Sequence, residues 1–195
     1  PYTTVLPKPL MPIGDKPILD ILLTQLAAHG FRDINVSVGY LGGLIEAFCG
    51  DGSRFGVDMD YVREAEPLGT VGPLQLINHG SEPFLVANGD VLTDLDFRAL
   101  YDFHRENRQI LTVATYHKEV KLQLGVLTLD KDNNILQYTE KPTFSHPVSM
   151  GVYCCSPEIS GFIPEGQRFD LPDLVRVLIE RNLPVRAFPH EGYWL

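Results

Sequence analysis

Short apolar runs alternate with segments of helical periodicity along the first 117 residues, and this alternation is the strongest constraint on the fold. The runs have the length of buried strands, and the segments between them carry apolar residues at helical spacing. Such alternation favours a parallel sheet with helices on both faces, so we expect an α/β, Rossmann-like, mostly parallel sheet. The expected strands are 34–38, 57–62, 83–87 and 110–116, and the expected helices are 17–29, 42–49, 70–78 and 97–107, the last capped by Asp96.

The pattern changes after residue 117. Two short strands at 124–129 and 135–140 are joined by Asp132-Asn133-Asn134, which is a good turn sequence. A strand at 148–154, an amphipathic helix at 170–182 with Asp170 as its cap, and a strand at 184–188 are expected to follow. The sequence therefore predicts one domain whose α/β core carries a smaller antiparallel insertion.

Charge and cysteine content exclude several classes of protein. The formal net charge is -9, which argues against a general binder of nucleic acid or of anionic membranes, because these partners require an excess of Lys and Arg. No apolar run approaches the roughly 20 residues of a membrane span, and no secretory signal is visible. The three cysteines, Cys49, Cys154 and Cys155, form no disulfide framework, so we expect a reducing, cytoplasmic compartment.

One candidate site follows the expected strand 83–87. Asn88-Gly89-Asp90 lies at its carboxyl end, where open parallel sheets bind their ligands. Gly89 lets the backbone approach a ligand closely, and the Asp90 carboxylate is suited to Mg²⁺, which takes one or two protein carboxylates together with phosphate oxygens. The alternative is that Asp90 only starts a turn.

A second candidate is the glycine-containing segment Leu68-Gly69-Thr70-Val71-Gly72. It precedes an expected helix, whose first amide N–H groups can bind a phosphate or the edge of a base, although a capped tight turn is an equal alternative. It is neither a dinucleotide fingerprint nor a Walker loop. Histidine spacing gives no zinc motif, and there is no G-x-S-x-G serine hydrolase motif.

Lys8 and Lys141 each precede a proline, which restricts the backbone of the lysine and so directs its long cationic side chain. A lysine is a compact charge suited to phosphate. Either lysine alone is typical of a solvated surface. The combination of both with Gly89-Asp90 and Leu68-Gly69-Thr70 points instead to a site for phosphorylated ligands.

At these residues the whole chain resembles the sugar-1-phosphate nucleotidyltransferases, such as mannose-1-phosphate guanylyltransferases and glucose-1-phosphate thymidylyltransferases. The motifs that carry the resemblance, in chain order, are Pro1-Tyr2-Thr3, Leu6-Pro7-Lys8-Pro9-Leu10, Pro12 to Ile18, Gly50 to Gly56, Glu66 to Gly72, Asn88-Gly89-Asp90, Glu140-Lys141-Pro142 and Gly192-Tyr193-Trp194-Leu195. The resemblance implies that a Gly-rich signature precedes Pro1 and that a second metal-binding Asp follows Leu195. On this basis both ends are expected to be truncated, residues 1–117 to bind the nucleotide and residues 118–195 the sugar phosphate.

The resemblance also implies residue roles in joining an NTP to a sugar-1-phosphate, which releases pyrophosphate. Asp90 would hold Mg²⁺ and Lys8 would neutralise the nucleotide phosphates, while Lys141 would contact the sugar phosphate. The remaining substrate-binding residues are expected to be Leu68, Gly69 and Thr70 at the base, Gly89 at the metal turn, and Gly125, Glu140, Ser149 and Gly151 at the sugar. A homo-oligomer or a fusion to further domains fits the family equally.

Two alternative functions stay open. The family often has Asn-Ala-Gly where this chain has Ser149-Met150-Gly151, and the shorter Ser149 does not reach a sugar hydroxyl as Asn does. A non-catalytic, regulatory relative that binds a nucleotide or sugar phosphate is therefore one alternative. A glycosyltransferase that uses a nucleotide sugar is the other, with Asp94-Leu95-Asp96 as its D-x-D motif, although capping of a helix is the simpler role for Asp96.

Overall fold

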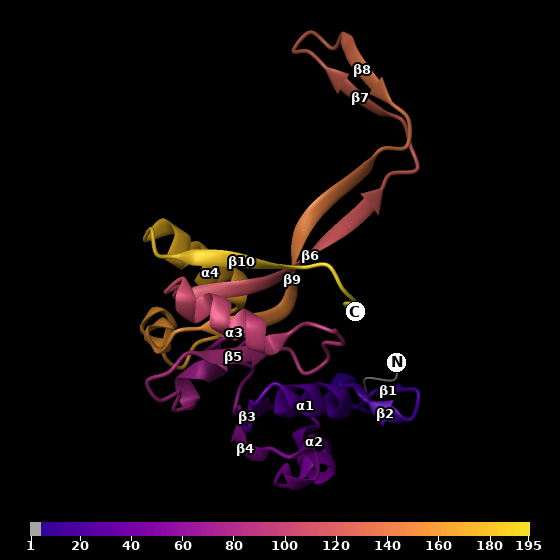
Figure 1. Cartoon of the computed structure of the whole chain (residues 1–195). Coiled ribbons are helices and arrows are strands. Elements are labelled where there is room, and N and C mark those ends of the chain that lie inside the picture. The colour runs from indigo at the N-terminus through magenta and orange to yellow at the C-terminus, as the bar shows by residue number, and fades with distance from the viewer. Residues whose placement is uncertain (1–4) are drawn as a thin grey trace.

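A computed structural model of the chain describes residues 5–195 and shows a layered α/β body from which a long β arm projects (Figure 1). The motif residues Pro1-Tyr2-Thr3 lie outside the described part. Among residues 5–195, no helix has both the length and the apolar character that crossing a membrane requires.

The larger sheet has four strands in the order β10-β6-β9-β5. Their bounds are β5 Phe84–Ala87, β6 Leu111–Lys121, β9 Thr143–Cys155 and β10 Val185–His190. The β10–β6 pair is parallel, whereas β9 runs antiparallel to both of its neighbours. The α/β class is therefore as expected, but β9, which comes after the arm in the chain, lies between β5 and β6 and separates them.

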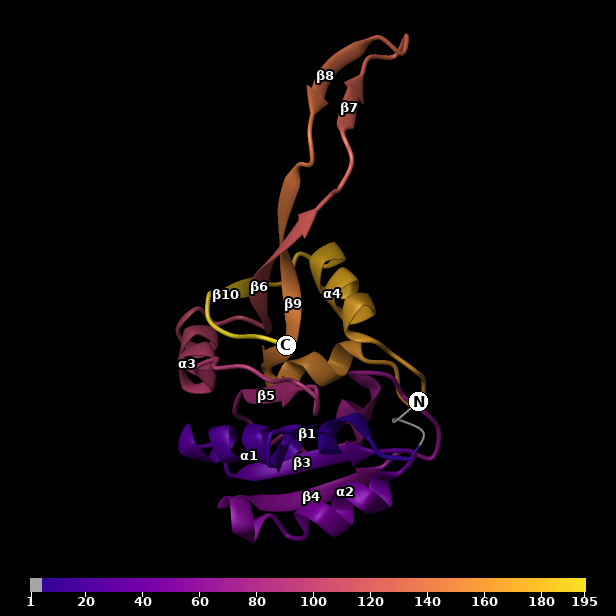
Figure 2. The same cartoon turned by 90° about the vertical axis from the view of Figure 1, so that its right-hand side faces the viewer.

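A second, parallel pair forms its own layer. It consists of β3 (Asp33–Val38) and β4 (Asp58–Arg63), paired in register from Asp33↔Asp58 to Val38↔Arg63. The helices α1 (Ile18–Ala28) and α2 (Gly42–Cys49) belong to this layer, because their apolar faces share a core cluster with Val38 and Met59. Figure 2 shows this layer below β5 and on the side of the body opposite to the arm.

Local sequence explains where the helices begin and end. Pro17 precedes α1, and Gly30, with a φ of 89°, allows the chain to turn after it. Asp96 caps α3 (Phe97–Glu106), because its side chain accepts a hydrogen bond from Ala99 N at 2.9 Å. The remaining helix, α4 (Leu171–Glu180), buries Leu171, Leu174 and Leu178.

The smaller elements are η2 Lys8–Leu10, β1 Pro12–Ile13, β2 Lys16–Pro17, η3 Ser53–Phe55, η4 Gly72–Leu76 and η5 Pro157–Phe162. The expected helix at 70–78 is wrong in type and length, since the structure has only the short 3-10 helix η4 there. Pro73 lies in its first turn and the chain is extended again by Ile77, so the segment cannot complete the turns of an α-helix.

The antiparallel insertion is an arm rather than a compact subdomain. The outer halves of β6 and β9 pair from Thr115↔Ser149 to Lys121↔Thr143, and β7 (Val126–Leu129) and β8 (Ile135–Thr139) form its tip. β6 and β9 are longer than expected for this reason. Both views show the arm extending away from the body (Figures 1 and 2). The three core clusters lie entirely in the body.

Candidate active site

The carboxyl ends of β3 and β5 meet the same short segment of chain. Val38, the last residue of β3, shares a core cluster with Leu10. Pro9 lies against Gly89 just past β5, where an added Cβ would be 3.1 Å from the Pro9 Cγ. Lys8 is exposed beside this contact, so the structure places Lys8 and the Gly89-Asp90 turn at one edge of the molecule.

The Asn88-Gly89-Asp90 turn is held by β9. Asn88 N donates to Gly151 O at 2.9 Å, and Val91 N closes the turn by donating to Asn88 O at 3.3 Å. Gly151 has a φ of 76°, and a Cβ there would lie 2.6 Å from the Asn88 Nδ2, so only glycine fits beside the turn. The half-buried Asp90 thus belongs to a turn, as in the alternative that it only starts a turn. That turn also lies at the end of β5, where the sequence predicts the site.

The last residues of the chain run beside the same turn. Leu92 and Leu195 exchange backbone hydrogen bonds of 2.9 and 3.2 Å, and the Trp194 Nε1 donates to Met150 O at 2.9 Å. The predicted terminal motif is therefore adjacent to the Asp90 turn. The partly buried Trp194 ring packs against Tyr116, in agreement with a role in the core.

Both carboxylates of the Asp94-Leu95-Asp96 pattern have local structural partners. Asp94 Oδ1 accepts from Tyr193 N at 2.6 Å and lies 2.8 Å from the His190 Nε2. Asp96 caps α3. Since each carboxylate has a different partner, the geometry favours structural roles over a D-x-D metal motif. Asp94 holds the C-terminal segment through Tyr193 and His190, and Asp96 caps a helix.

The loop from Leu68 to Gly72 is held on two sides. Leu68 N donates to Glu64 Oε2 at 2.8 Å, and Thr70 N donates to Asp170 Oδ1 at 3.0 Å. Val71 N and Gly72 N both donate to Phe169 O at 3.2 Å. Within residues 5–195, only Gly69 N of these five amides has no acceptor, so the loop is a bonded turn that leaves one N–H, and not several, for a phosphate or the edge of a base.

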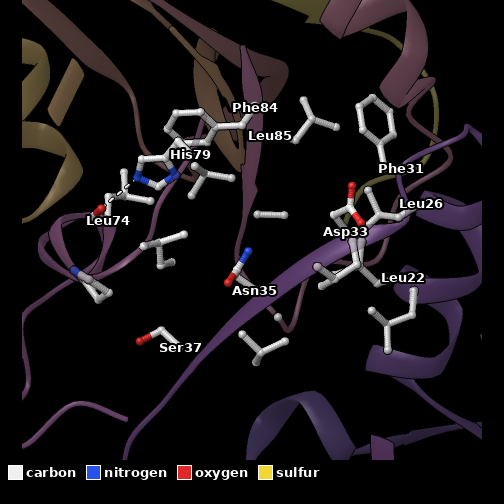
Figure 3. A pocket seen from close by; sticks show the side chains of 18 of the residues that line it. Leu22, Leu26, Phe31, Asp33, Asn35, Ser37, Leu74, His79, Phe84 and Leu85 are labelled. Atoms are coloured by element: carbon white, nitrogen blue, oxygen red, sulfur yellow. Dashed lines mark hydrogen bonds between the residues drawn. The ribbon is translucent and has the colours of Figure 1, made fainter. Parts of the chain in front are cut away.

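A cavity of about 900 Å³ separates β3 from β5 (Figure 3). Residues of both strands line it, with apolar side chains such as Leu22, Leu26 and Leu85 beside the polar Asp33, Asn35 and Ser37 of β3. Gly69, Thr70 and Gly89 also line it, which connects the predicted nucleotide residues to one continuous hollow.

One wall of this cavity contains the half-buried His79. Its ring stacks on Phe84 with 4.0 Å between centroids, and its Nε2 lies 2.7 Å from Leu74 O. Burial lowers the pKa of His79 below its ordinary 6.5, so the ring adds no fixed positive charge to the cavity at neutral pH.

The predicted sugar residues fall into two groups. Gly125, Glu140 and Lys141 lie on the arm, which the structure does not bring to Asp90 (Figures 1 and 2). There Tyr138 OH donates to Glu140 Oε2 at 2.7 Å, and the Lys141 Nζ lies 3.6 Å from Glu140 Oε1. Ser149 and Gly151 lie instead on β9 in the body, beside the Asn88 turn.

Ser149 is engaged locally. Its Oγ lies 2.9 Å from the Tyr153 OH, and it accepts a bond from Gly151 N at 3.3 Å. These contacts coincide with the irregular register of β6 and β9 between Val113 and Thr115. The hydroxyl therefore stabilises the backbone that presents Gly151 to the turn.

Comparison with known proteins decides the family. The family described as nucleotidyl transferase matches residues 1–195. The chain belongs to the nucleotidyl transferase family. It is 35% identical to a UTP–glucose-1-phosphate uridylyltransferase of Synechocystis, covering 100% of this chain and 55% of the relative. It is 29% identical to a mannose-1-phosphate guanylyltransferase of Mycobacterium tuberculosis, covering 100% and 56%.

Solved structures agree with this assignment. HddC from Yersinia pseudotuberculosis matches with a TM-score of 0.73 and 25% identity over 97% of this chain and 84% of HddC. A Bacillus anthracis protein solved with sucrose has a TM-score of 0.76 at 21% identity, covering 100% and 82%, which supports the fold. The chain spans about half the length of the curated relatives it matches.

Asp90 does not belong to a cluster of metal-ligating side chains in the described part of the chain. Among the described residues, no group of three or more His, Cys, Asp or Glu could hold a metal ion. This donor set fits Mg²⁺ only when ligand phosphates supply further oxygens, which is the usual way proteins bind Mg²⁺ with nucleotides.

Two carboxylates that hold the Leu68–Gly72 loop have no clear signal in the sequence. No pattern indicates Glu64, and the sequence indicates Asp170 only as the cap of α4. Asp170 does precede α4, but its side chain accepts from Thr70 N, 100 residues away, instead of from its own helix. No local pattern reveals such a contact, since it depends on how two distant segments meet.

Proposed function

We propose that this nucleotidyl transferase joins an NTP to a sugar-1-phosphate, giving an NDP-sugar and pyrophosphate. The observation that carries the proposal is the convergence at one edge of the molecule. Lys8, the Gly89-Asp90 turn and the Leu68–Gly72 loop all lie where β3 and β5 end. The curated relatives are named for reactions of this type with UTP or as guanylyltransferases.

The chemistry requires positioning more than a covalent nucleophile. An oxygen of the sugar-1-phosphate attacks the α-phosphorus of the NTP, and the bond from that phosphorus to the bridging oxygen breaks as pyrophosphate leaves. In this proposal the Leu68–Gly72 loop holds the base through Gly69. Lys8 balances phosphate charge, and Asp90 holds Mg²⁺, which supplies further charge neutralisation.

The arm gives a specific reason to test the regulatory alternative. Gly125, Glu140 and Lys141 lie away from Asp90, so the sugar half of the proposed site is not assembled around it. In a regulatory relative the protein binds nucleotide but produces no pyrophosphate. In the proposed enzyme these arm residues serve the sugar phosphate during turnover.

We also propose that the enzyme is Mg²⁺-dependent and acts in the cytoplasm. The single carboxylate of Asp90 supports the first proposal. The second is supported by the three free, buried thiols of Cys49, Cys154 and Cys155, which form no disulfide among themselves.

The test measures pyrophosphate release by the full-length gene product with Mg²⁺, across UTP, GTP, CTP and dTTP and a panel of hexose- and heptose-1-phosphates. We expect turnover with at least one pair. Asp90→Asn should reduce kcat by at least about 100-fold without changing the unfolding midpoint, because the isosteric amide loses the charge that holds the metal. Asp60→Asn, at an exposed position of β4, is the matched control and should retain activity.

Two outcomes would oppose these assignments. Tight nucleotide binding without pyrophosphate release across the whole panel would establish the regulatory alternative. Full activity in Asp90→Asn would remove Asp90 as the metal ligand.

A further inference from the structure

Two segments about 100 residues apart are joined by several hydrogen bonds at the Leu68–Gly72 loop. Phe169 N donates to Leu68 O at 2.8 Å, and Phe169 O accepts from both Val71 N and Gly72 N at 3.2 Å. The segment ahead of α4 therefore runs along the loop, and Phe169 forms hydrogen bonds with three of its backbone groups. Buried Val71 and Gly72 place this contact next to the core cluster that contains Leu171 and Leu174.

Asp170 and Thr70 complete this contact with a reciprocal pair of hydrogen bonds. Thr70 N donates to Asp170 Oδ1 at 3.0 Å, while Leu171 N donates to Thr70 Oγ1 at 2.8 Å. The second carboxylate oxygen is 3.2 Å from the Arg168 Nε, which donates to it. The Asp170 side chain thus accepts from a backbone amide of the loop, and the Thr70 side chain accepts from the first amide of α4. This exchange resembles a capping box made between distant parts of the chain.

The Asp170 carboxylate is negatively charged at neutral pH. The hydrogen bond from the Thr70 amide is the main cause that lowers the pKa of Asp170; burial opposes it, and the hydrogen bond and charge of Arg168 add to the lowering. The amide dipoles at the start of α4 favour the same charge. A charged acceptor forms stronger hydrogen bonds than a neutral one, so the loop is held by the ionised form.

Gly69 shows how closely the carboxylate shapes the loop. Its φ is 81°, and an added Cβ would lie 2.6 Å from the Asp170 Oδ1 and 2.7 Å from Phe169 O. The Asp170 carboxylate therefore occupies the space that a side chain at position 69 would need. Within residues 5–195, the Gly69 amide is the one N–H of the loop that has no acceptor, so it can donate to a ligand.

We propose that Asp170 is a positioning residue for the nucleotide, because its carboxylate fixes the Leu68–Gly72 loop in the shape that presents Gly69 to the base. This inference rests on the proposed function, in which that loop contacts the NTP. Asp170 itself touches the loop and need not touch the nucleotide, so its removal should weaken NTP binding and leave the sugar-1-phosphate contacts unchanged.

Glu64 anchors the start of the loop independently of Asp170. Its Oε2 accepts from Leu68 N, and its Oε1 accepts from the Ser37 Oγ at 2.6 Å. The loop is therefore anchored to the β3–β4 layer by Glu64 and to α4 by Asp170. Loss of Asp170 frees one side of the loop while the other stays attached.

The experiment compares Asp170→Ala with Asp96→Ala in the full-length gene product. Both residues are aspartates that precede a helix, but the polar contacts of the Asp96 side chain within residues 5–195 are with its own helix and with His29. Calorimetry measures the Kd of each Mg²⁺–NTP, and steady-state assays measure KM for both substrates. We expect Asp170→Ala to raise the NTP Kd and KM by about 5- to 20-fold, a loss typical of one charged hydrogen bond, with the sugar-1-phosphate KM changed less than about twofold.

Asp170→Asn tests how much of the effect depends on the charge. The amide oxygen can still accept from Thr70 N, but more weakly than the carboxylate, so this variant should recover part of the NTP affinity lost in Asp170→Ala. Asp96→Ala should lower the unfolding midpoint about as much as Asp170→Ala does, but it should leave the NTP Kd unchanged.

If the NTP Kd of Asp170→Ala equals that of the wild type, or if Asp96→Ala weakens it equally, the positioning role is overturned while the proposed function stands. If the wild-type protein binds NTP and releases no pyrophosphate, the proposed function fails. The ratio of the two Kd values still decides the role of Asp170 in that case.

Discussion

Individual polar side chains of this protein are used to join segments that are distant in sequence, and His104 shows this inside the body. It is 1% exposed, with its Nδ1 2.9 Å from the Thr112 Oγ1 and its Nε2 3.0 Å from the Ser156 Oγ. Because the Ser156 hydroxyl donates to Gln109 O at 2.8 Å, it accepts from the histidine. The network therefore requires a proton on Nε2. Burial lowers the pKa of His104, which favours the neutral ring with that single proton.

The stability of the protein should fall on mild acidification. Burial lowers the folded pKa of His104 below its ordinary 6.5, so between these two values the unfolded chain binds more protons than the folded protein. The free energy of unfolding is then fully supported above pH 6.5 and decreases as the pH falls toward the folded pKa. Urea unfolding at a series of pH values from 7.5 to about 5 measures this slope.

His104→Gln is the informative variant, because its amide retains one hydrogen bond and does not titrate. We expect a lower stability at pH 7.5 and a shallower decrease with acid, with part of the decrease kept by His79, whose pKa burial also lowers. His117→Gln, at an exposed position of the arm, serves as the control. A slope that is unchanged in His104→Gln would show that this histidine does not couple folding to pH.

Among the elements, the β7–β8 tip of the arm has the least support. Every residue from 131 to 141 is exposed, and Leu127 and Tyr138, which pair across the two strands, both leave their side chains in solvent. A two-stranded ribbon without a covering layer is marginally stable in water. We expect hydrogen exchange of amides in 126–139 to be at least about tenfold faster than in the inner halves of β6 and β9.

Mass-spectrometric hydrogen exchange provides the comparison within one sample. Strands β6 and β9 are their own reference, since Leu111 and Cys155 pair inside the body while Lys121 and Thr143 pair on the arm. Equal protection along the whole length of both strands would mean that the arm is covered in solution.

The elements also show how far sequence patterns reach. The positions of α1, α2, α3 and β3 were predictable, because Pro17, Gly30 and Asp96 end or cap them locally and their apolar spacing is regular. Strand pairing was not, since nothing local places β9 between β5 and β6. The Asp90 turn followed from its strand end, whereas the contact of Asp170 with Thr70 depends on tertiary folding and had no local signal.

At the scale of the whole molecule, two layers are joined by few connections. The β3–β4 layer has its own core cluster, which includes Leu23, and the larger sheet has two others, one of which contains Leu174. β3 and β5 share no ladder, and a cavity of about 900 Å³ lies between them. Among the connections are α1, which contributes Leu22 and Leu26 to a cluster of the larger sheet, the contact of Pro9 with Gly89, and the Leu68–Gly72 loop anchored by Glu64 and Asp170.

This arrangement predicts that the two layers respond differently to damage in their cores. Leu23→Ala and Leu174→Ala each remove a fully buried side chain and should each cost about 2–5 kcal/mol. Trp194, the single tryptophan, lies against Tyr116 and Met150 in the larger sheet, so its fluorescence reports that layer, while far-UV circular dichroism reports both. We expect Leu23→Ala to shift the dichroism midpoint in urea more than the fluorescence midpoint, and Leu174→Ala to shift both. Coincident midpoints in Leu23→Ala would show instead that α1 and the anchored loop are sufficient to make the two layers unfold as one cooperative unit.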